Sequence, residues 1–184
     1  DFSRQRIRPG TLRHLVSLAR QAEVEHSRTA MFAGDPINNT EGRAVLHTLL
    51  RAGRLKREHP LAPASREVQS VLRAMLRFVD TVHNGTVKSS NGVRFTDVIN
   101  IGIGGSDRGI DMAGTALANV GSGLRLHCVS NVDGTQLADL AKTLDPSRTL
   151  IVICSKTFTT LETMTNAQAA RTWISQSLGE DAVA

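Results

Sequence analysis

The sequence predicts an α/β fold, a parallel sheet with flanking helices in three αβα layers, preceded by a helical N-terminal region. Two observations lead to this prediction. Residues 1–90 place apolar side chains at helical spacing, whereas from about residue 96 short apolar runs alternate with helical segments. Such alternation is typical of a parallel sheet covered on both faces. We therefore expect a helical region over residues 1–90 and an α/β subdomain over residues 91–184.

Helical patterns dominate the N-terminal region. Three stretches show the spacing: residues 12–19, 41–51 and 68–82. Thr40 is a plausible N-cap for the second of them. A basic, Pro-containing connection over residues 53–63 separates the second from the third. The dipeptides Asn84-Gly85 and Asn91-Gly92 predict turns on the way to the second half.

The second half contains three candidate strands, each followed by a helical segment. The strands are expected at residues 98–103, 124–130 and 149–154. The helices are expected near residues 108–118, 134–144 and 160–177, with right-handed crossovers. Open sheets usually have more than three strands, and the chain stops soon after a helix. We therefore expect an incomplete set of domains.

Composition argues against several classes of protein. Hydrophobic residues make up 40% and charged residues 21% of the chain, which is typical of soluble globular proteins. No apolar run approaches the roughly 20 residues of a membrane span, so we expect no membrane partner. Cys128 and Cys154 lie in apolar runs and show no metal or disulfide spacing, so we expect buried free thiols in a reducing cytoplasm. The six histidines are dispersed without ligand spacing, so we expect no metal. No other cofactor is expected.

Positive charge is concentrated in the N-terminal region. Residues 1–80 carry 14 Lys and Arg against 8 Asp and Glu, whereas residues 81–184 carry 8 against 9. Basic regions can bind nucleic acid, but the arginines are scattered, no aromatic residues are interleaved with them, and the chain has no Tyr. We therefore expect no nucleic acid partner. Solvated helix faces or contacts with other protein are the favoured interpretation, and an anionic partner is the less favoured one.

A glycine-rich stretch, IGIGGSDRG at residues 101–109, follows the first predicted strand. Ligands of α/β sheets bind at the carboxyl ends of the strands, where glycines let the backbone approach an anion and the next helix offers free N–H groups. The dinucleotide pattern fails because Asp107 replaces its third glycine. The Walker pattern fails because Ile110 and Asp111 replace its Lys and Ser/Thr. A generic phosphate site remains, and a turn needed only for packing is the alternative.

A hydroxyl-rich stretch, SKTFTT at residues 155–160, follows the third predicted strand. Four hydroxyls and one lysine at the start of a helix suit a phosphate dianion. Structural roles are also open, because Thr159 and Glu162 fit a capping box and Lys156 could be a solvated charge. Both loops would leave the same edge of one sheet, so we expect them to share a crevice. After the middle strand, Asp133 and Gly134 are interpreted as an N-cap and a turn residue.

These motifs, together with MFAGDPINNTEGRAVLH at residues 31–47, resemble the glucose-6-phosphate isomerase family. The similarity runs in order over essentially the whole chain. It implies a fold of two sugar-isomerase α/β subdomains, of which residues 91–184 would be the first and the second would be absent. It also implies that Ser155, Thr157 and Thr160 hold the substrate phosphate, with Ser106 and Lys156 alongside.

The same resemblance implies that the backbone of Gly105 lines the sugar site. The complete set of candidate binding residues is Gly105, Ser106, Ser155, Lys156, Thr157, Phe158, Thr159 and Thr160. Arg108 and Ile110 depart from the usual leucine and proline of the family. Arg108 would either add positive charge near the phosphate or point to solvent.

The family interconverts glucose 6-phosphate and fructose 6-phosphate through a cis-enediol, without a metal, in glycolysis and gluconeogenesis. Its dimeric members imply a homodimer here. The resemblance places the base glutamate and the ring-opening histidine downstream, so no catalytic residue is assigned in this chain and the isolated chain is expected to be inactive. The alternative is a stand-alone sugar-phosphate binding or regulatory module with the same fold.

Overall fold

The chain folds into two compact units. A computed structural model describes residues 2–121 and 123–183, and its units span residues 1–76 and 77–184. One long helix, α3 (Ala62–His83), crosses the boundary between them. Among the described residues, no helix combines the length and the apolar character that a membrane crossing requires.

The first unit is helical. It contains α1 (Pro9–Gln21), α2 (Val24–Ala33) and the first part of α3. The helix predicted over residues 12–19 lies within α1 and is confirmed. Helix α2 was not predicted from the sequence. Its N-cap, Glu23, and its C-cap, Gly34, are both in the left-handed conformation, at φ 53° and φ 84°. No residue of α2 is buried.

The helix predicted over residues 41–51 is wrong. Only a short 3-10 helix, His47–Leu50, forms there. The residues before it make a tight turn, in which the amide of Asn38 donates to the carbonyl of Arg43 over 3.1 Å. The hydroxyl of Thr40 donates to Asn38 Oδ1 over 2.8 Å and caps no helix. An Asn side chain that bonds its own neighbours offers the backbone an alternative to a helix, and here that alternative is adopted.

The third predicted helix, residues 68–82, is confirmed within α3. The turn predicted after it is also present, because Gly85 adopts φ 76° and its amide donates to the carbonyl of Val82 over 3.1 Å. Gly92 adopts φ 72°. Both glycines occupy a left-handed region that other residues rarely adopt, as the two Asn-Gly pairs predicted.

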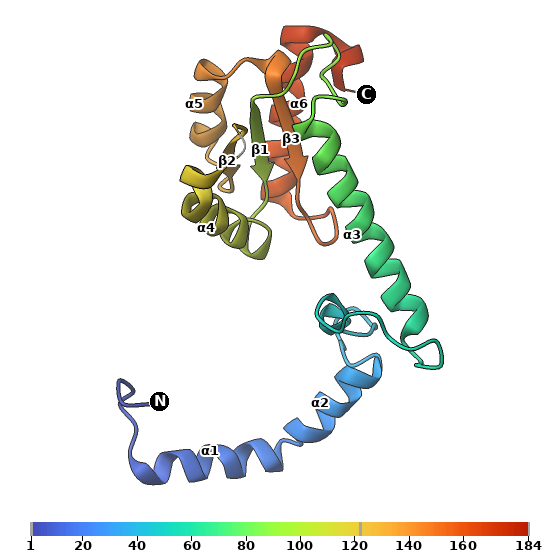
Figure 1. Ribbon diagram of the computed structural model, residues 1–184. Helices are drawn as coiled ribbons and strands as arrows, with labels where there is room; N and C mark the ends of the chain where they lie inside the picture. Colours follow the sequence, from blue (N-terminus) through green and yellow to red (C-terminus); the bar gives the residue numbers. More distant parts are fainter. Residues whose placement is uncertain (1, 122, 184) are drawn as a thin grey trace. The chain divides into compact units, whose positions relative to one another are not determined.

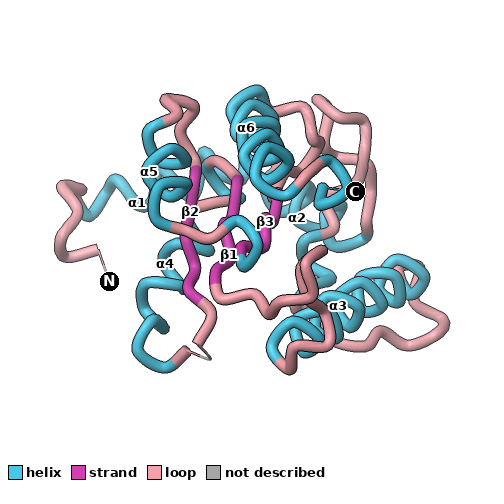
Figure 2. The backbone as a smooth tube through the Cα atoms, turned by 90° about the horizontal axis from the view of Figure 1, so that it is seen from above, coloured by secondary structure: helices cyan, strands magenta, loops and turns pink. Residues whose placement is uncertain are grey.

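The second unit contains a sheet of three parallel strands. They are β1 (Asp97–Ile101), β2 (Arg125–Val129) and β3 (Thr149–Ile153), in the spatial order β2-β1-β3 (Figures 1 and 2). The three predicted strands are confirmed to within two residues at each end. The register places Ile101 opposite both Val129 and Ile153. The three strands therefore end level with one another, and their following loops start side by side.

Helices α5 (Thr135–Thr143) and α6 (Leu161–Leu178) cover one face of this sheet. Apolar side chains from the strands and from both helices form the core: Ile99, Ile101, Val129, Leu137, Leu144 and Ala170, with Leu140, Ile151 and Trp173 packed against them. Side chains alternate between the faces of a strand, so Ile99 and Ile101 share the face that α5 and α6 cover. Both helices occur where the sequence predicted them, to within two residues.

Helix α4 (Arg108–Leu117) packs against the other face, beside β2 (Figure 1). Gly114 sits so close to Leu126 that a Cβ on this glycine would lie 2.5 Å from a Leu126 methyl carbon. The side chain of Leu126 nevertheless keeps 41% of its surface exposed, so α4 covers this side of the sheet only in part. The arrangement confirms the predicted α/β fold with helices on both faces of a parallel sheet.

Candidate functional site

The glycine loop and the hydroxyl loop leave the sheet from adjacent strands. Backbone hydrogen bonds continue one residue beyond the strand ends, since the amide of Gly102 donates to Val129 over 3.1 Å and that of Cys154 donates to Ile101 over 2.8 Å. The two loops therefore start side by side at the carboxyl edge, where ligands of α/β sheets bind. The sequence predicted that both loops leave the same edge of one sheet, and the observed strand order β2-β1-β3 makes their two strands direct neighbours.

Gly102 is needed for close packing. A Cβ on this residue would lie 2.5 Å from the carbonyl oxygen of Ser106 and 3.0 Å from that of Cys154. Backbone oxygens cannot move aside as a flexible side chain can, so no other residue fits here. For Gly102, the packing interpretation of the glycine motif is correct.

Gly105 differs from Gly102. It is exposed, and a Cβ on it would meet no atom within 4 Å. Interior packing therefore does not require a glycine at position 105. An open backbone at the carboxyl edge of a sheet is what a closely approaching ligand needs.

Two buried polar residues frame the glycine loop. The Asn100 side chain, which is 3% exposed, donates from Nδ2 to the carbonyl of Ser106 over 3.1 Å and so holds the turn. Asp107 is 5% exposed and starts α4, where its carbonyl accepts from the amides of Ile110 and Asp111. Its side-chain oxygen Oδ1 has no hydrogen-bond partner among the described residues. A buried carboxylate oxygen without a hydrogen-bond partner is uncommon. The hydrogen-bonding capacity of the polar groups at this edge is therefore not fully used.

The hydroxyl loop is organised by its own side chains. Ser155 Oγ accepts from the amide of Phe158 over 3.0 Å, and the hydroxyls of Thr157 and Thr159 lie 2.7 Å apart in a shared hydrogen bond. Phe158 adopts φ 54°, a left-handed conformation that is strained for a bulky residue. The loop is thus a compact turn with several hydroxyls brought together.

The capping box predicted for Thr159 and Glu162 is wrong. The N-cap of α6 is Thr160, and its side chain makes no capping hydrogen bond. Thr159 bonds to Thr157 instead, across the left-handed residue Phe158. The start of α6 therefore lacks the side-chain cap that the sequence predicted.

The loop after β2 is closed on itself. The side chain of Gln136 accepts from the amides of Ser130 and Asn131, over 3.0 and 3.2 Å. Asp133 lies one residue before the observed N-cap, Gly134, but its carboxylate does accept from the first helical amide over 3.0 Å. Gly134 is the turn residue, at φ 76°, as predicted. This loop has the structural role that the sequence analysis favoured.

Asn166 connects this loop to the next helix. It is 3% exposed on α6, and its Nδ2 donates to the carbonyl of Asn131 over 2.9 Å. The sequence did not predict any role for three residues whose side chains hold the loops at this edge: Asn100, Gln136 and Asn166. A polar residue within an apolar pattern was the only available signal.

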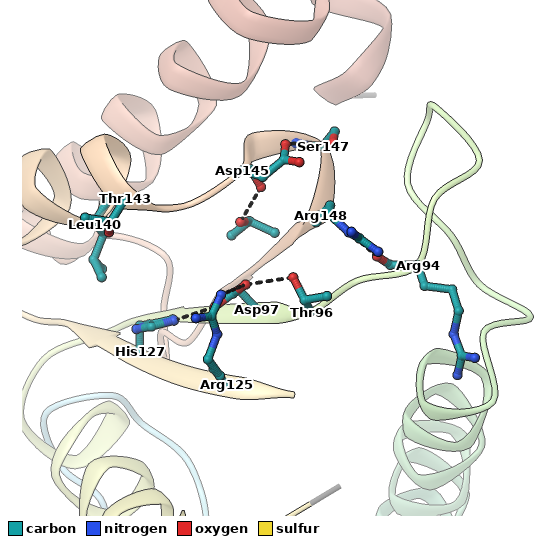
Figure 3. Close-up of polar contacts among 11 residues, drawn as sticks. Arg94, Thr96, Asp97, Arg125, His127, Leu140, Thr143, Asp145, Ser147 and Arg148 are labelled. Atoms are coloured by element: carbon teal, nitrogen blue, oxygen red, sulfur yellow. Dashed lines mark hydrogen bonds and ion pairs between the residues drawn. The ribbon is translucent and has the colours of Figure 1, made fainter. Parts of the chain in front are cut away.

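A different polar cluster lies at the opposite edge, where the strands begin (Figure 3). Asp97 is 1% exposed, and its Oδ2 accepts from Thr96 and from Arg125, both over 2.8 Å. Its Oδ1 lies 2.8 Å from His127 Nε2. Burial by itself would raise the pKa of Asp97, but the hydrogen bonds from Arg125, His127 and Thr96 outweigh it and hold that pKa below its ordinary value.

The two cysteines are free thiols and only partly buried. Burial raises the pKa of the Cys128 thiol, and the charges of Asp107 and Asp111 raise it further. Complete burial, which the sequence predicted, does not occur because α4 covers its side of the sheet incompletely. Within the described part of the chain, no group of three or more His, Cys, Asp or Glu side chains could hold a metal ion.

The fold defines an α/β protein whose candidate site lies at the carboxyl edge of a parallel sheet, between a glycine loop and a hydroxyl loop. The chain belongs to the phosphoglucose isomerase family, whose sequence pattern it matches over residues 1–184. The resemblance found in the sequence motifs is confirmed.

Sequence comparison with individual relatives supports this assignment. The glucose-6-phosphate isomerase of Brucella ovis is 50% identical over 187 residues, a match that covers 100% of this chain and 34% of the relative. The glucose-6-phosphate isomerase of Methylocella silvestris is 47% identical over 191 residues, and this match also covers 100% of this chain and 34% of the relative. The chain therefore spans about a third of the length of the curated relatives that it matches.

A solved structure shows the same fold. The crystal structure of a glucose-6-phosphate isomerase from Chlamydia trachomatis is similar to this chain with a TM-score of 0.67 at 26% sequence identity. The similarity covers 95% of this chain and 33% of that chain.

Proposed function

We propose that the protein is a glucose-6-phosphate isomerase and that this chain supplies its sugar-phosphate cradle. One observation carries the proposal: the glycine loop and the hydroxyl loop leave adjacent strands at the same edge of the sheet. The cradle consists of the residues that the sequence analysis selected: Gly105, Ser106, Ser155, Lys156, Thr157, Phe158, Thr159 and Thr160.

The hydrogen bonds within the hydroxyl loop favour a phosphate. Ser155 Oγ already accepts from a backbone amide, so its hydroxyl hydrogen can turn to an external acceptor. Thr157 and Thr159 share one hydrogen bond, which uses one of their two hydroxyl hydrogens and leaves the other. A phosphate dianion offers only acceptors, so it complements a loop with surplus donors.

The glycine loop suits the sugar. The space around Gly105 would let a sugar approach the backbone, and the Asn100 side chain holds the neighbouring Ser106 in place. Residues 91–184 would then be the first sugar-isomerase subdomain, behind a helical region over residues 1–90. The reaction would move a proton between C2 and C1 of the opened sugar, through a cis-enediol.

In this proposal, the groups that move the proton belong to a part of the enzyme outside this chain. A base glutamate and a ring-opening histidine would come from there, so the isolated chain is expected to be inactive. The complete enzyme would act as a cytoplasmic homodimer without a cofactor. Turnover by a rigorously purified 184-residue chain would contradict the assignment of these groups to another part of the enzyme.

Ser155→Ala and Thr157→Val in the complete enzyme test the cradle. Losing one hydrogen bond to a charged group costs about 1.5–3 kcal/mol, so each variant should bind fructose 6-phosphate roughly 10- to 150-fold more weakly. Thr172→Val is the matched control, because Thr172 lies exposed on α6 and its hydroxyl bonds within that helix. Unchanged KM and unchanged inhibition by a phosphosugar in both cradle variants would refute the assignment.

A further inference from the structure

Four arginines line a hollow in the first unit. The hollow has a volume of about 670 Å³, and its arginines are Arg54, Arg57, Arg66 and Arg73. Its lining lies on α3 and on the connection that precedes that helix. This basic connection is the feature of the sequence that the isomerase site leaves unexplained.

The backbone explains why these side chains converge. Arg66 and Arg73 are seven residues apart, about two turns of α3, so they lie on one face of the helix. Arg54 and Arg57 come from the connection, which is packed against the start of α3. Ser65, only 3% exposed, donates from Oγ to the carbonyl of Gly53 over 3.4 Å. Ala62, which also lines the hollow, is 1% exposed.

The charge of the hollow is uncompensated. No acidic side chain lines it, and none of its four guanidinium groups forms a hydrogen bond or an ion pair within the part of the chain that the structure describes. Elsewhere in the chain, Arg43, Arg125 and Arg171 each pair with a carboxylate. Four like charges around one hollow repel one another, and a bound anion would relieve that repulsion.

We propose that this hollow binds a small molecule that carries two phosphate groups. Two phosphate dianions would balance four guanidinium charges, and the guanidinium fork binds phosphate oxygens in pairs. The volume lies within the roughly 300–1,000 Å³ of small-molecule sites. No aromatic side chain lines the hollow for bases to stack on, which disfavours a nucleic acid. An anionic partner of the basic N-terminal region was the less favoured interpretation of the sequence, and this hollow is the place where it would bind.

Inorganic pyrophosphate is the probe for this proposal. Its binding is measured by isothermal titration calorimetry on the complete protein, in the wild type and in Arg66→Gln/Arg73→Gln. Each lost charged hydrogen bond weakens binding about 10-fold or more, so the double variant should bind at least about 100-fold more weakly. Arg51→Gln/Arg77→Gln is the matched control, since it removes the same charge from two arginines outside the hollow, and it should bind as the wild type does.

Three results would overturn the proposal. The first is equal pyrophosphate affinity in all three proteins, or no binding by the wild type. The second is equal affinity of the wild type for orthophosphate and pyrophosphate, which would indicate a single-phosphate site. The third is a lower melting temperature of Arg66→Gln/Arg73→Gln without added anion, which would indicate that these arginines pair with a protein segment. An unchanged or higher melting temperature without anion supports the site, because like charges have been removed.

Discussion

The two edges of the sheet use polar residues in opposite ways. At the amino edge, Asp97 is buried and both of its oxygens have partners, Thr96 and Arg125 on one and His127 on the other. At the carboxyl edge, Asp107 is also buried, yet its Oδ1 has no hydrogen-bond partner among the described residues. Parallel strands in register place all starts at one edge and all ends at the other. The polar groups at one edge can therefore form hydrogen bonds that stabilise the fold, while those at the other edge stay available to a ligand.

The largest expected effect belongs to the amino edge. Asp97→Ala removes three hydrogen bonds to a buried carboxylate, and hydrogen bonds to a charged group contribute about 1.5–3 kcal/mol each. Because Arg125 is largely exposed and stays solvated without its partner, the free energy of unfolding should fall by about 2–4 kcal/mol. Urea denaturation at neutral pH measures this. Asp139→Ala is the control, because the exposed pair of Asp139 with Lys142 should contribute at most about 0.5 kcal/mol. A loss below about 1 kcal/mol at Asp97 would remove the proposed contrast between the edges.

Gly102→Ala and Gly105→Ala separate packing from binding at the carboxyl edge. The new methyl at position 102 would press on the backbone oxygens of Ser106 and Cys154, and overpacking of this kind costs about 1–3 kcal/mol. At position 105 the methyl meets open space, so stability should change by less than about 0.5 kcal/mol while fructose 6-phosphate binding weakens. Thermal unfolding and ligand titration of both variants measure this, and equal destabilisation by both would contradict it.

The amino edge also predicts a dependence on pH. The pKa of Asp97 is lower in the folded protein than in the unfolded chain, so the ionised form stabilises the fold. That contribution is complete above the unfolded pKa of about 3.9 and is lost as the pH falls through the folded value. In Asp97→Asn this dependence is absent, so the stability difference between wild type and variant should shrink below about pH 4. Denaturation curves from about pH 7 to about pH 3 measure it, and a constant difference would contradict the assignment.

Only a small loss of stability is expected at Asp107. Asp107→Asn breaks no hydrogen bond of Oδ1 and loses only the favourable charge at the start of α4, so stability should fall by less than about 1 kcal/mol. The variant should also lower the pKa of Cys128, because the Asp107 charge helps to raise it. Alkylation of Cys128 by iodoacetamide at neutral pH should then be faster. Destabilisation as large as that of Asp97→Ala would show that Asp107 has a structural partner.

The sequence predicted the elements of the second unit well, because the signal for each was local. Three apolar runs gave the strands, and the motifs after them gave the two loops of the candidate site. Predictions from local sequence were wrong where a side chain had several possible hydrogen-bond partners nearby. Asn38 bonded to its own turn instead of allowing a helix, and Thr159 paired with Thr157 instead of capping α6. Both pairings depend on backbone angles that residue types alone do not specify.

By itself, the sequence determined the α/β alternation, the composition of the two loops and the membership of the family. The tertiary structure alone decided which glycine is required for packing and which buried carboxylate is satisfied. Asp97 and His127 are 30 residues apart, and only the register of β1 and β2 brings them within 2.8 Å. The arginines of the hollow likewise look scattered in the sequence and converge only when their connection packs on α3. Periodicity reports local structure, whereas contacts between distant residues depend on how the elements pack.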